Sequence, residues 1–278
     1  QLNWLHDPTF TGEYLAAEAD KSFISIKVGG PNIFPLNELK SGQANFAVVG
    51  ADIFLRALDK DQISEGRSEL LAVFVDFQRN PVGWVLHPDA GDALGFPKAA
   101  ISDRKLANSW MFSQLRKKRL LLGDKRGTET TSVWLKWRDM RGLGDEIKVV
   151  PVGFDASIIL DAPKLLFPVY LNEEPFKLSA KLSRPLIEFD PADDGVRLYG
   201  NVLLTTRKFF DQHPTAVKKF TNLLTLGWYA ARHDLNKATA VVAKLYHGVD
   251  KKIIREQVKK TLSFVFEGTK APGDMDVS

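Results

Sequence analysis

The residue types that most often perform catalysis are few and scattered in this sequence of 278 residues. The chain contains no cysteine, which excludes disulfides, cysteine nucleophiles, cysteine-rich zinc sites and iron–sulfur clusters. No two histidines have the spacing of a metal-binding pair on a helix, and none accompanies a serine in a G-x-S-x-G turn. The five histidines are His6, His87, His213, His233 and His247. We therefore expect neither a catalytic centre nor a bound metal or cofactor.

Motifs that hold phosphate groups are also missing from the sequence. There is no Walker A motif, and the segment Gly29–Pro31 lacks the glycine spacing of a dinucleotide-binding fingerprint. We interpret this segment as a turn that forms the wall of a pocket. His6 follows the first expected strand, where it fits either the pocket or its rim. Neither feature predicts a reaction.

Aromatic and polar side chains recur where the expected strands end. Any one of these aromatics fits a hydrophobic core at least as well, but their repeated placement favours a binding site, because ligands of open α/β sheets lie outside the carboxyl ends of the strands. Rings stack on flat ligands, while amides and carboxylates recognise them by directional hydrogen bonds. This combination predicts a small flat heterocycle, uncharged or weakly basic. The candidate ligand-binding residues are Trp4, Phe10, Tyr14, Asp52, Phe77, Asn80, Thr128, Tyr170, Asn172, Glu174, Tyr199 and Asn201.

Strand-like and helix-like segments alternate in the first part of the chain, and these elements must position the candidate residues. Apolar runs and apolar–polar alternation predict the strands, while capping residues, Pro and Gly delimit the helices. Such alternation predicts parallel βαβ units. The expected strands are 2–5, 22–28, 44–49, 70–77 and 82–86, and the expected helices are 11–19, 35–41 and one that begins at 50–52.

The periodic pattern weakens between residues 88 and 114, which predicts a connection between two lobes with a short helix near 106–112. A second α/β unit follows before the chain returns to the first. We expect one lobe from residues 1–113 and 199–278, a second from residues 114–198, and a disordered tail at 268–278. The other expected strands are 119–123, 147–152, 165–171 and 198–205, and the other expected helices are 127–141, 156–160, 213–233, 235–246 and 251–264.

The charge of the chain is mildly basic, with a formal net charge of +4. The tightest basic cluster is 116–119, and without a stacking platform beside it we interpret it as a solvated surface and expect no nucleic-acid partner. No segment approaches the ~18 consecutive apolar residues of a membrane span. The chain begins at Gln1 without a basic and apolar leader, so we expect a mature product whose export signal has been removed.

Several motifs resemble, in this order along the chain, the thiamine-pyrimidine-synthase-like group of periplasmic binding proteins. The resemblance runs from about residue 3 to residue 245, and the ordered series is more specific than any single motif. The motifs are N-W-L-x-D-P-x-F-x-G-E-Y at 3–14, G-G-P at 29–31, S-G-Q-A-N-F-A-V-V-G-A-D at 41–52, F-Q-R-N-P-V-G-W-V-L-H-P at 77–88, G-T-E-T at 127–130, V-P-V-G-F at 150–154, P-V-Y-L-N-E-E-P at 168–175 and Y-G-N-V at 199–202.

The resemblance implies the α/β type II periplasmic-binding fold, with two α/β lobes, a central cleft and two crossing segments. It also implies a monomeric, extracytoplasmic solute-binding component that captures its ligand by hinge closure and delivers it to an ABC permease. Within the group, the thiamine-precursor and riboflavin binders imply a flat heterocyclic cargo. By position, Trp4, Tyr14 and Tyr170 would stack on it, Asn172 and Glu174 would bond to it, and Asp52 and Thr128 would lie at helix starts facing the cleft.

Three features of this chain depart from the group and leave the identity of the ligand open. The stretch after Tyr14 is shorter, the connection at 89–113 is longer, and Glu13 stands where a small or neutral residue is common. Relatives also bind sulfonates, taurine or nitrate, although Glu173 and Glu174 argue against such anions. A different class on the same fold is an iron-dependent pyrimidine synthase, but that enzyme carries a cysteine-rich motif that this chain lacks.

Overall fold

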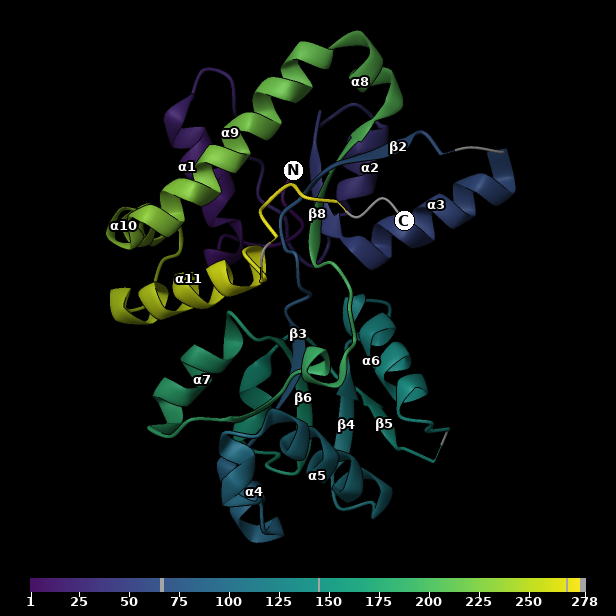
Figure 1. The fold of residues 1–278 in the computed structure, drawn as a ribbon, viewed down its shortest axis with the longest axis vertical. Helices are drawn as coiled ribbons and strands as arrows, with labels where there is room; N and C mark the ends of the chain where they lie inside the picture. Colours follow the sequence, from purple (N-terminus) through teal and green to yellow (C-terminus); the bar gives the residue numbers. More distant parts are fainter. Residues whose placement is uncertain (66–67, 145, 269, 276–278) are drawn as a thin grey trace. The chain divides into compact units, whose positions relative to one another are not determined.

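The computed structural model of the protein describes residues 1–65, 68–144, 146–268 and 270–275, and the chain divides into two compact units (Figure 1). Unit 1 combines Gln1–Asn80 with Leu198–Ser278, and unit 2 is Pro81–Arg197. The chain therefore crosses between the units twice, as expected. The return crossing lies within one residue of its predicted position.

The first crossing follows residue 80, whereas the sequence predicted a boundary at residue 113. The reason is strand β3 (Val82–Leu86), which pairs with β6 (Leu165–Tyr170) and β7 (Ile187–Phe189) and so belongs to the sheet of unit 2. Sequence periodicity identified β3 as a strand but could not indicate its partners, so residues 81–113 were expected in the first lobe and belong instead to unit 2.

The sheet described in unit 1 has the strand order β1-β8-β2, and both pairings are antiparallel. The return segment forms the central strand, with Val202 opposite both Val49 and Val75. The parallel pairing predicted from the alternating pattern does not occur in this sheet, because its middle strand comes from the far end of the chain. The strands are β1 (Ala47–Gly50), β2 (Leu70–Val75) and β8 (Asn201–Thr206).

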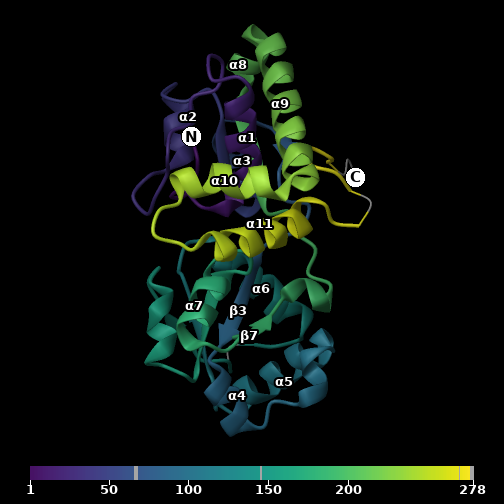
Figure 2. The same cartoon turned by 90° about the vertical axis from the view of Figure 1, so that its left-hand side faces the viewer.

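Helices α1 and α9 of unit 1 pack along each other with two glycines at their contact (Figure 1). A Cβ on Gly227 would lie 2.3 Å from the carbonyl oxygen of Gly12, and a Cβ on Gly12 would lie 2.3 Å from the Trp228 ring. Helices α10 and α11 also pack on one another (Figure 2). The helices are η1 (Pro8–Phe10), α1 (Thr11–Ala19), α2 (Pro35–Lys40), α3 (Ala51–Glu65), α8 (Arg207–Gln212), α9 (Pro214–His233), α10 (Leu235–Leu245) and α11 (Lys251–Val265).

Two expected strands of unit 1, at 2–5 and 22–28, are not regular strands: residues 3–5 bend, residues 22–23 form a turn, and 24–28 have no regular secondary structure. Two backbone hydrogen bonds join the segments, from Leu2 N to the carbonyl of Lys27 and from Gly29 N to the carbonyl of Trp4, each 2.9 Å long. The backbone of Gly29 lies so near this segment that a Cβ would be 2.4 Å from the carbonyl oxygen of Leu2. The predicted turn at Gly29–Pro31 thus contacts the first segment closely.

The tail predicted to be disordered is partly fastened to unit 1. The side-chain amide of Gln78 donates to the carbonyls of Ala271 (2.8 Å) and Asp274 (2.9 Å), and Gly273 N donates to the carbonyl of Val75. The prediction is therefore wrong for residues 271–274, while positions 269 and 276–278 lie outside the described residues. The tail was predicted to be disordered from its composition, and composition does not show contacts that backbone groups make.

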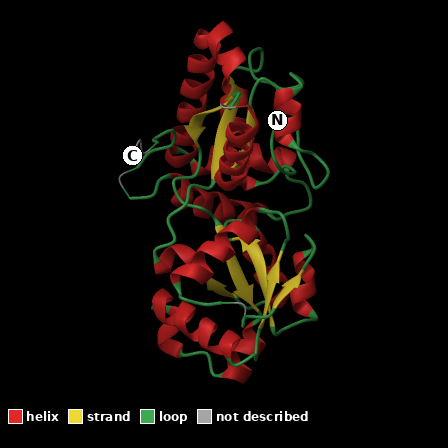
Figure 3. Cartoon of the chain, turned by 90° about the vertical axis from the view of Figure 1, so that its right-hand side faces the viewer, coloured by secondary structure: helices red, strands yellow, loops and turns green. Residues whose placement is uncertain are grey.

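Unit 2 contains a sheet of order β5-β4-β6-β3-β7, with helices on its faces (Figure 3). Strand β4 (Leu121–Asp124) is parallel to β5 (Val149–Pro151) and to β6, so the predicted parallel pairing holds here. Strand β3 runs antiparallel to both of its neighbours. Buried Trp84 donates from Nε1 to the carbonyl of Gly123 (2.9 Å), which ties β3 to the end of β4.

The segment predicted as a loose connection is mostly helical. Pro88 begins α4, and Gly95 adopts the left-handed conformation that ends it. Asp103 caps the first turn of α5. Helix α7 and strand β7 were not predicted. The helices are α4 (Pro88–Leu94), η2 (Lys98–Ile101), α5 (Arg104–Arg116), α6 (Glu129–Met140), η3 (Ala156–Leu160), α7 (Glu174–Leu182) and η4 (Pro191–Asp194).

Candidate functional site

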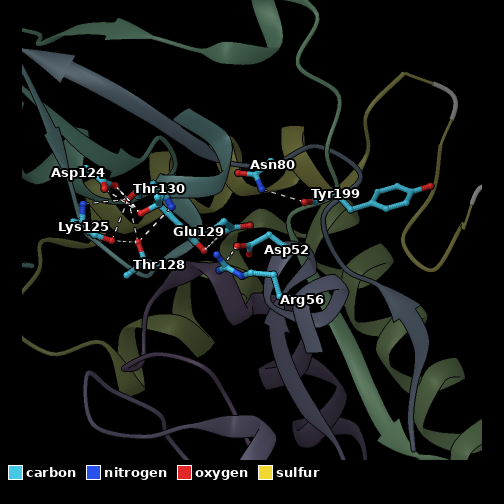
Figure 4. A network of polar contacts seen from close by, with 11 residues as sticks. Asp52, Arg56, Asn80, Asp124, Lys125, Thr128, Glu129, Thr130 and Tyr199 are labelled. Atoms are coloured by element: carbon cyan, nitrogen blue, oxygen red, sulfur yellow. Dashed lines mark hydrogen bonds and ion pairs between the residues drawn. The ribbon is translucent and has the colours of Figure 1, made fainter. Parts of the chain in front are cut away.

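The candidate site of unit 2 is built where β4 ends and α6 begins (Figure 4). Gly127, at a φ of 77°, allows the tight turn that joins them. Thr128 caps α6 by accepting from Thr130 N (3.3 Å), and its hydroxyl donates to the carbonyl of Lys125 (2.6 Å). The backbone of this turn is thereby fixed, and the first turn of α6 is held at the end of the strand.

Asp124 is the anchor of this turn. Its carboxylate accepts from the hydroxyls of Thr130 (3.1 Å) and Thr131 (2.9 Å), and it is almost completely buried. A carboxylate that already accepts two hydroxyl hydrogen bonds, enclosed by the fold, serves to position its neighbours. The sequence analysis did not predict a role for Asp124. The signal that could have identified it is an acidic residue at the end of an apolar strand.

A buried ion pair joins the two strand ends of the site. Lys125 is only 8% exposed, and its Nζ lies 3.2 Å from Oε1 of Glu174 and 5.2 Å from the centre of the Phe167 ring. The other oxygen of Glu174 accepts from Tyr170 N (2.7 Å). Glu174 was predicted as a ligand residue, but its two oxygens bond to Lys125 and to the backbone. It fixes the start of α7 against the end of β6.

Glu129 and Tyr170 form the second polar pair of the site. The hydroxyl of half-buried Tyr170 donates to Oε2 of Glu129, which is buried in the first turn of α6. A carboxylate is favoured there because the amino end of a helix carries partial positive charge. Asn172 is fully buried after β6, and Glu173 pairs with Lys177. The site thus has four carboxylates, from Asp124, Glu129, Glu173 and Glu174, and three basic side chains, from Lys125, Arg126 and Lys177.

In unit 1 the predicted polar residues mainly fasten the chain near its crossings (Figure 4). The side chain of Asn80 donates to the carbonyl of Tyr199 (3.0 Å), and its N–H donates to the carbonyl of Leu198 (2.9 Å). Asn201 begins β8 and accepts from the side chain of Asn3 (3.4 Å). The ring of Tyr199 is directed away from Asn80, with Lys270 Nζ 5.5 Å from its centre. These contacts give Asn80 and Asn201 structural roles.

Asp52 lies in the first turn of α3, as the sequence predicted. It forms an ion pair with Arg56, one turn further along the helix, at 2.6 Å. Its carboxylate is therefore placed at the amino end of the helix and partly neutralised there.

Three of the aromatics predicted to bind the ligand occupy core positions in unit 1. Phe10 and Tyr14 are buried and pack edge to face, and Phe77 is fully buried against Trp228 and Phe264. The sequence placed these rings at strand ends, but the apolar helices of unit 1 cover them. The other predicted aromatics, Trp4, Tyr170 and Tyr199, are half-buried.

The hydroxyl of Tyr14 is used inside unit 1. It accepts from Asp7 N (3.3 Å) and lies 3.1 Å from Nδ1 of His6. Burial lowers the pKa of His6, with the charge of His247 as a smaller cause. His6 therefore helps to hold the Tyr14 side chain in place.

A buried pair of acids in unit 1 was missed by the sequence reasoning. Glu13 in α1 is 4% exposed and Asp76, just after β2, is 1% exposed. Trp228 Nε1 donates to one oxygen of Asp76 (3.1 Å), while Asp76 Oδ2 and Glu13 Oε2 have no partner within the described residues. Burial raises the pKa of Asp76 to about 7, and burial together with the charge of Asp76 raises the pKa of Glu13 well above its usual range.

Comparisons with known proteins agree on the fold. A sequence model of the family described as NMT1/THI5 like matches residues 137–238, about a third of the chain. No curated protein sequence matches the chain. Among the described residues, no helix combines the length and apolarity that a membrane crossing requires.

Three solved structures illustrate the likeness. The nitrate-binding protein NrtA from Synechocystis superimposes with a TM-score of 0.65 at 11% identity, over 93% of this chain and 69% of its own. The alkanesulfonate-binding protein SsuA from Xanthomonas axonopodis gives 0.60 at 12%, over 100% and 86%. A Candida albicans protein described as having the generic periplasmic binding protein fold gives 0.56 at 13%, over 93% and 79%. The chain has the periplasmic-binding-protein fold.

Proposed function

We propose that the chain is the extracytoplasmic solute-binding component of an ABC importer, a monomer that delivers a small molecule to a membrane permease. The fold and the partial family match support this class. The carrying observation is the strand-end cluster of unit 2, where the carboxylates, hydroxyls and Lys125 form a fixed network within the described chain. A polar surface whose acids and Lys125 are bonded to other groups of the protein is suited to binding rather than to reaction.

The proposed cargo is a small flat heterocycle that carries hydrogen-bond donors, such as a thiamine pyrimidine precursor or a flavin. Tyr170 is half-buried and offers a ring for stacking, while Glu129 and Glu174 hold acceptor oxygens in place beside it. Four carboxylates against the basic side chains of Lys125, Arg126 and Lys177 leave a small excess of acid, and recognition of a sulfonate or nitrate requires donors or positive charge. The acid excess therefore favours a donor-bearing cargo.

A binder of sulfonate or nitrate is the second candidate, because two of the similar structures bind such anions. In the candidate site, Lys125 is a buried cation that would attract the anion. Its Nζ is already paired with Glu174 and enclosed by aromatic rings, which leaves less of its charge for an anion.

Native mass spectrometry of the freshly purified full chain tests the proposal. We expect one co-purified molecule per chain, with the mass of a pyrimidine or a flavin, and no stoichiometric iron by elemental analysis. A co-purified sulfonate or nitrate would show that the cargo is an anion and not a heterocycle, while the chain would still be a solute-binding component. Stoichiometric iron together with formation of a pyrimidine product would contradict the class and favour the synthase.

A further inference from the structure

The tightest cluster of basic residues in the sequence lies in unit 2. The turn from Arg116 to Arg119 contains four consecutive basic residues, all exposed. The whole chain has 38 Lys and Arg against 34 Asp and Glu, so these four residues equal its entire net charge of +4. The remaining basic and acidic residues balance. An excess this local calls for an explanation beyond general solubility.

Two further lysines lie beside this turn. Leu121 N donates to the carbonyl of Lys164 (3.1 Å) and Leu122 N donates to that of Lys148 (3.3 Å), so both lysines flank the start of β4. Both are exposed. Because β4, β5 and β6 are parallel, their starts share one edge, at the opposite end of these strands from the candidate site. We name residues 116–119, Lys148 and Lys164 the basic edge.

The charges of the basic edge are not neutralised within the described part of the chain. None of its six residues forms an ion pair with a described residue, whereas Lys125 and Lys177 of the same unit are each paired with a glutamate. The acids that share these segments are Glu146 and Asp161, both exposed, and Asp145, which lies outside the described residues. The edge therefore keeps a net positive charge.

Among the described residues, the basic edge has no large exposed apolar side chain directly beside it in sequence. Leu115, Leu120, Ile147 and Leu165 are buried, Leu121 and Val149 are half-buried, and the exposed apolar neighbour is the small ring of Pro163. A specific protein interface needs buried aromatic or aliphatic contacts at its centre, and a nucleic-acid surface needs stacking rings. A lipid headgroup layer needs neither, because it attracts clusters of Lys and Arg through its surface potential alone.

We propose that the basic edge is an electrostatic docking surface for anionic lipid headgroups, which would concentrate the protein at the membrane that holds its transporter. This inference concerns a surface remote from the cargo-binding residues of unit 2 and does not depend on which solute is bound. The attraction requires no insertion into the bilayer and is screened by salt.

Vesicle co-sedimentation of the full chain tests this proposal. We expect binding to phosphatidylcholine vesicles that contain phosphatidylglycerol, no binding to pure phosphatidylcholine, and loss of binding at about 1 M salt. The change of Arg116, Lys117, Lys118 and Arg119 to Gln should weaken partitioning at least about tenfold. A second variant, Lys148→Gln with Lys164→Gln, should weaken it less.

The matched control changes four exposed lysines of unit 1 to Gln, namely Lys237, Lys251, Lys252 and Lys259. It removes the same net charge, so binding within about threefold of the unmodified chain supports a local surface. Equal loss of vesicle binding in both quadruple variants would overturn the proposal, because binding would then depend on the net charge of the whole chain. Absence of vesicle binding would also overturn it, and retention on soluble polyglutamate in that case would favour an acidic protein partner. Melting followed by circular dichroism checks that each variant is folded.

Discussion

Carboxylates are used in opposite ways in the two units. In unit 2, Glu174 meets Lys125 and Glu129 meets Tyr170, so each acid has a partner that holds it in place. In unit 1, Glu13 and Asp76 are also buried, but each has an oxygen without a partner in the described chain. Burial without a cation favours the protonated form, whereas a partner favours the charged form. The contrast separates a pH-dependent structural element in unit 1 from a fixed polar network in unit 2.

The largest expected effect concerns the acid pair. A group whose pKa is raised on folding holds its proton in the folded state after the unfolded chain has released it, so its contribution to stability is lost as pH rises. The ordinary pKa of Asp76 is 3.8 and the folded value is about 7, so the free energy of unfolding should fall between these pH values. The loss should be on the order of a few kcal/mol.

Chemical denaturation of Asp76→Asn between pH 4 and pH 8 checks this expectation. Asparagine keeps an acceptor for Trp228 and cannot ionise, so most of this loss should disappear. Glu13→Gln should act in the same direction. The exposed variant Asp59→Asn should retain the slope of the unmodified chain. An unchanged slope in Asp76→Asn would show that the pair does not control stability.

The ion pair of unit 2 should respond to its own substitution. Glu174→Gln leaves Lys125 buried with its charge unpaired, which should lower the free energy of unfolding by about 2–4 kcal/mol. The double variant Lys125→Met with Glu174→Gln should recover much of this loss. Thermal unfolding measures both, and a single variant as stable as the unmodified chain would remove the ion pair from the account.

Tyr170 should matter more for binding than for folding. Tyr170→Ala removes the proposed stacking ring and should weaken ligand binding by about 1–3 kcal/mol while the chain stays folded. Tyr170→Phe keeps the ring and loses only the bond to Glu129. Calorimetry that gave equal affinity for the Ala variant would exclude Tyr170 from the binding surface.

The smallest expected effect is at the cap of α6. Thr128→Ala removes the side-chain bond to Thr130 N and should cost about 1 kcal/mol of stability. Thr128→Ser keeps that bond and is the control. A melting temperature of the Ala variant equal to that of the Ser variant would show that the cap does not stabilise the turn.

Local patterns predicted much of the secondary structure. The helix at Thr11–Ala19 and the strand at Val82–Leu86 were predicted with the observed bounds, and the long C-terminal helices were predicted closely. Pairing was harder, because residue 85 and residue 167 become neighbours only after the chain crosses into unit 2. Periodicity shows that a segment is a strand and carries no information about which strand lies beside it.

The candidate site was predicted less completely. Helix starts such as Thr128 and Asp52 carry a local signal and were found. The depth of a ring carries none, so Phe77 was expected at a ligand and packs against Trp228 instead. The partners of Lys125 and Glu129 lie more than forty residues away in sequence, where no local pattern reaches.

Isothermal titration calorimetry of the full chain tests the central claim most directly. A panel of an aminopyrimidine, riboflavin, an alkanesulfonate and nitrate separates the candidate cargoes. The account predicts that one heterocycle binds at one molecule per chain with a Kd in the micromolar to nanomolar range, roughly −8 to −12 kcal/mol, and that both anions give no heat. Tight binding of the sulfonate or nitrate, with no heat from either heterocycle, would contradict it.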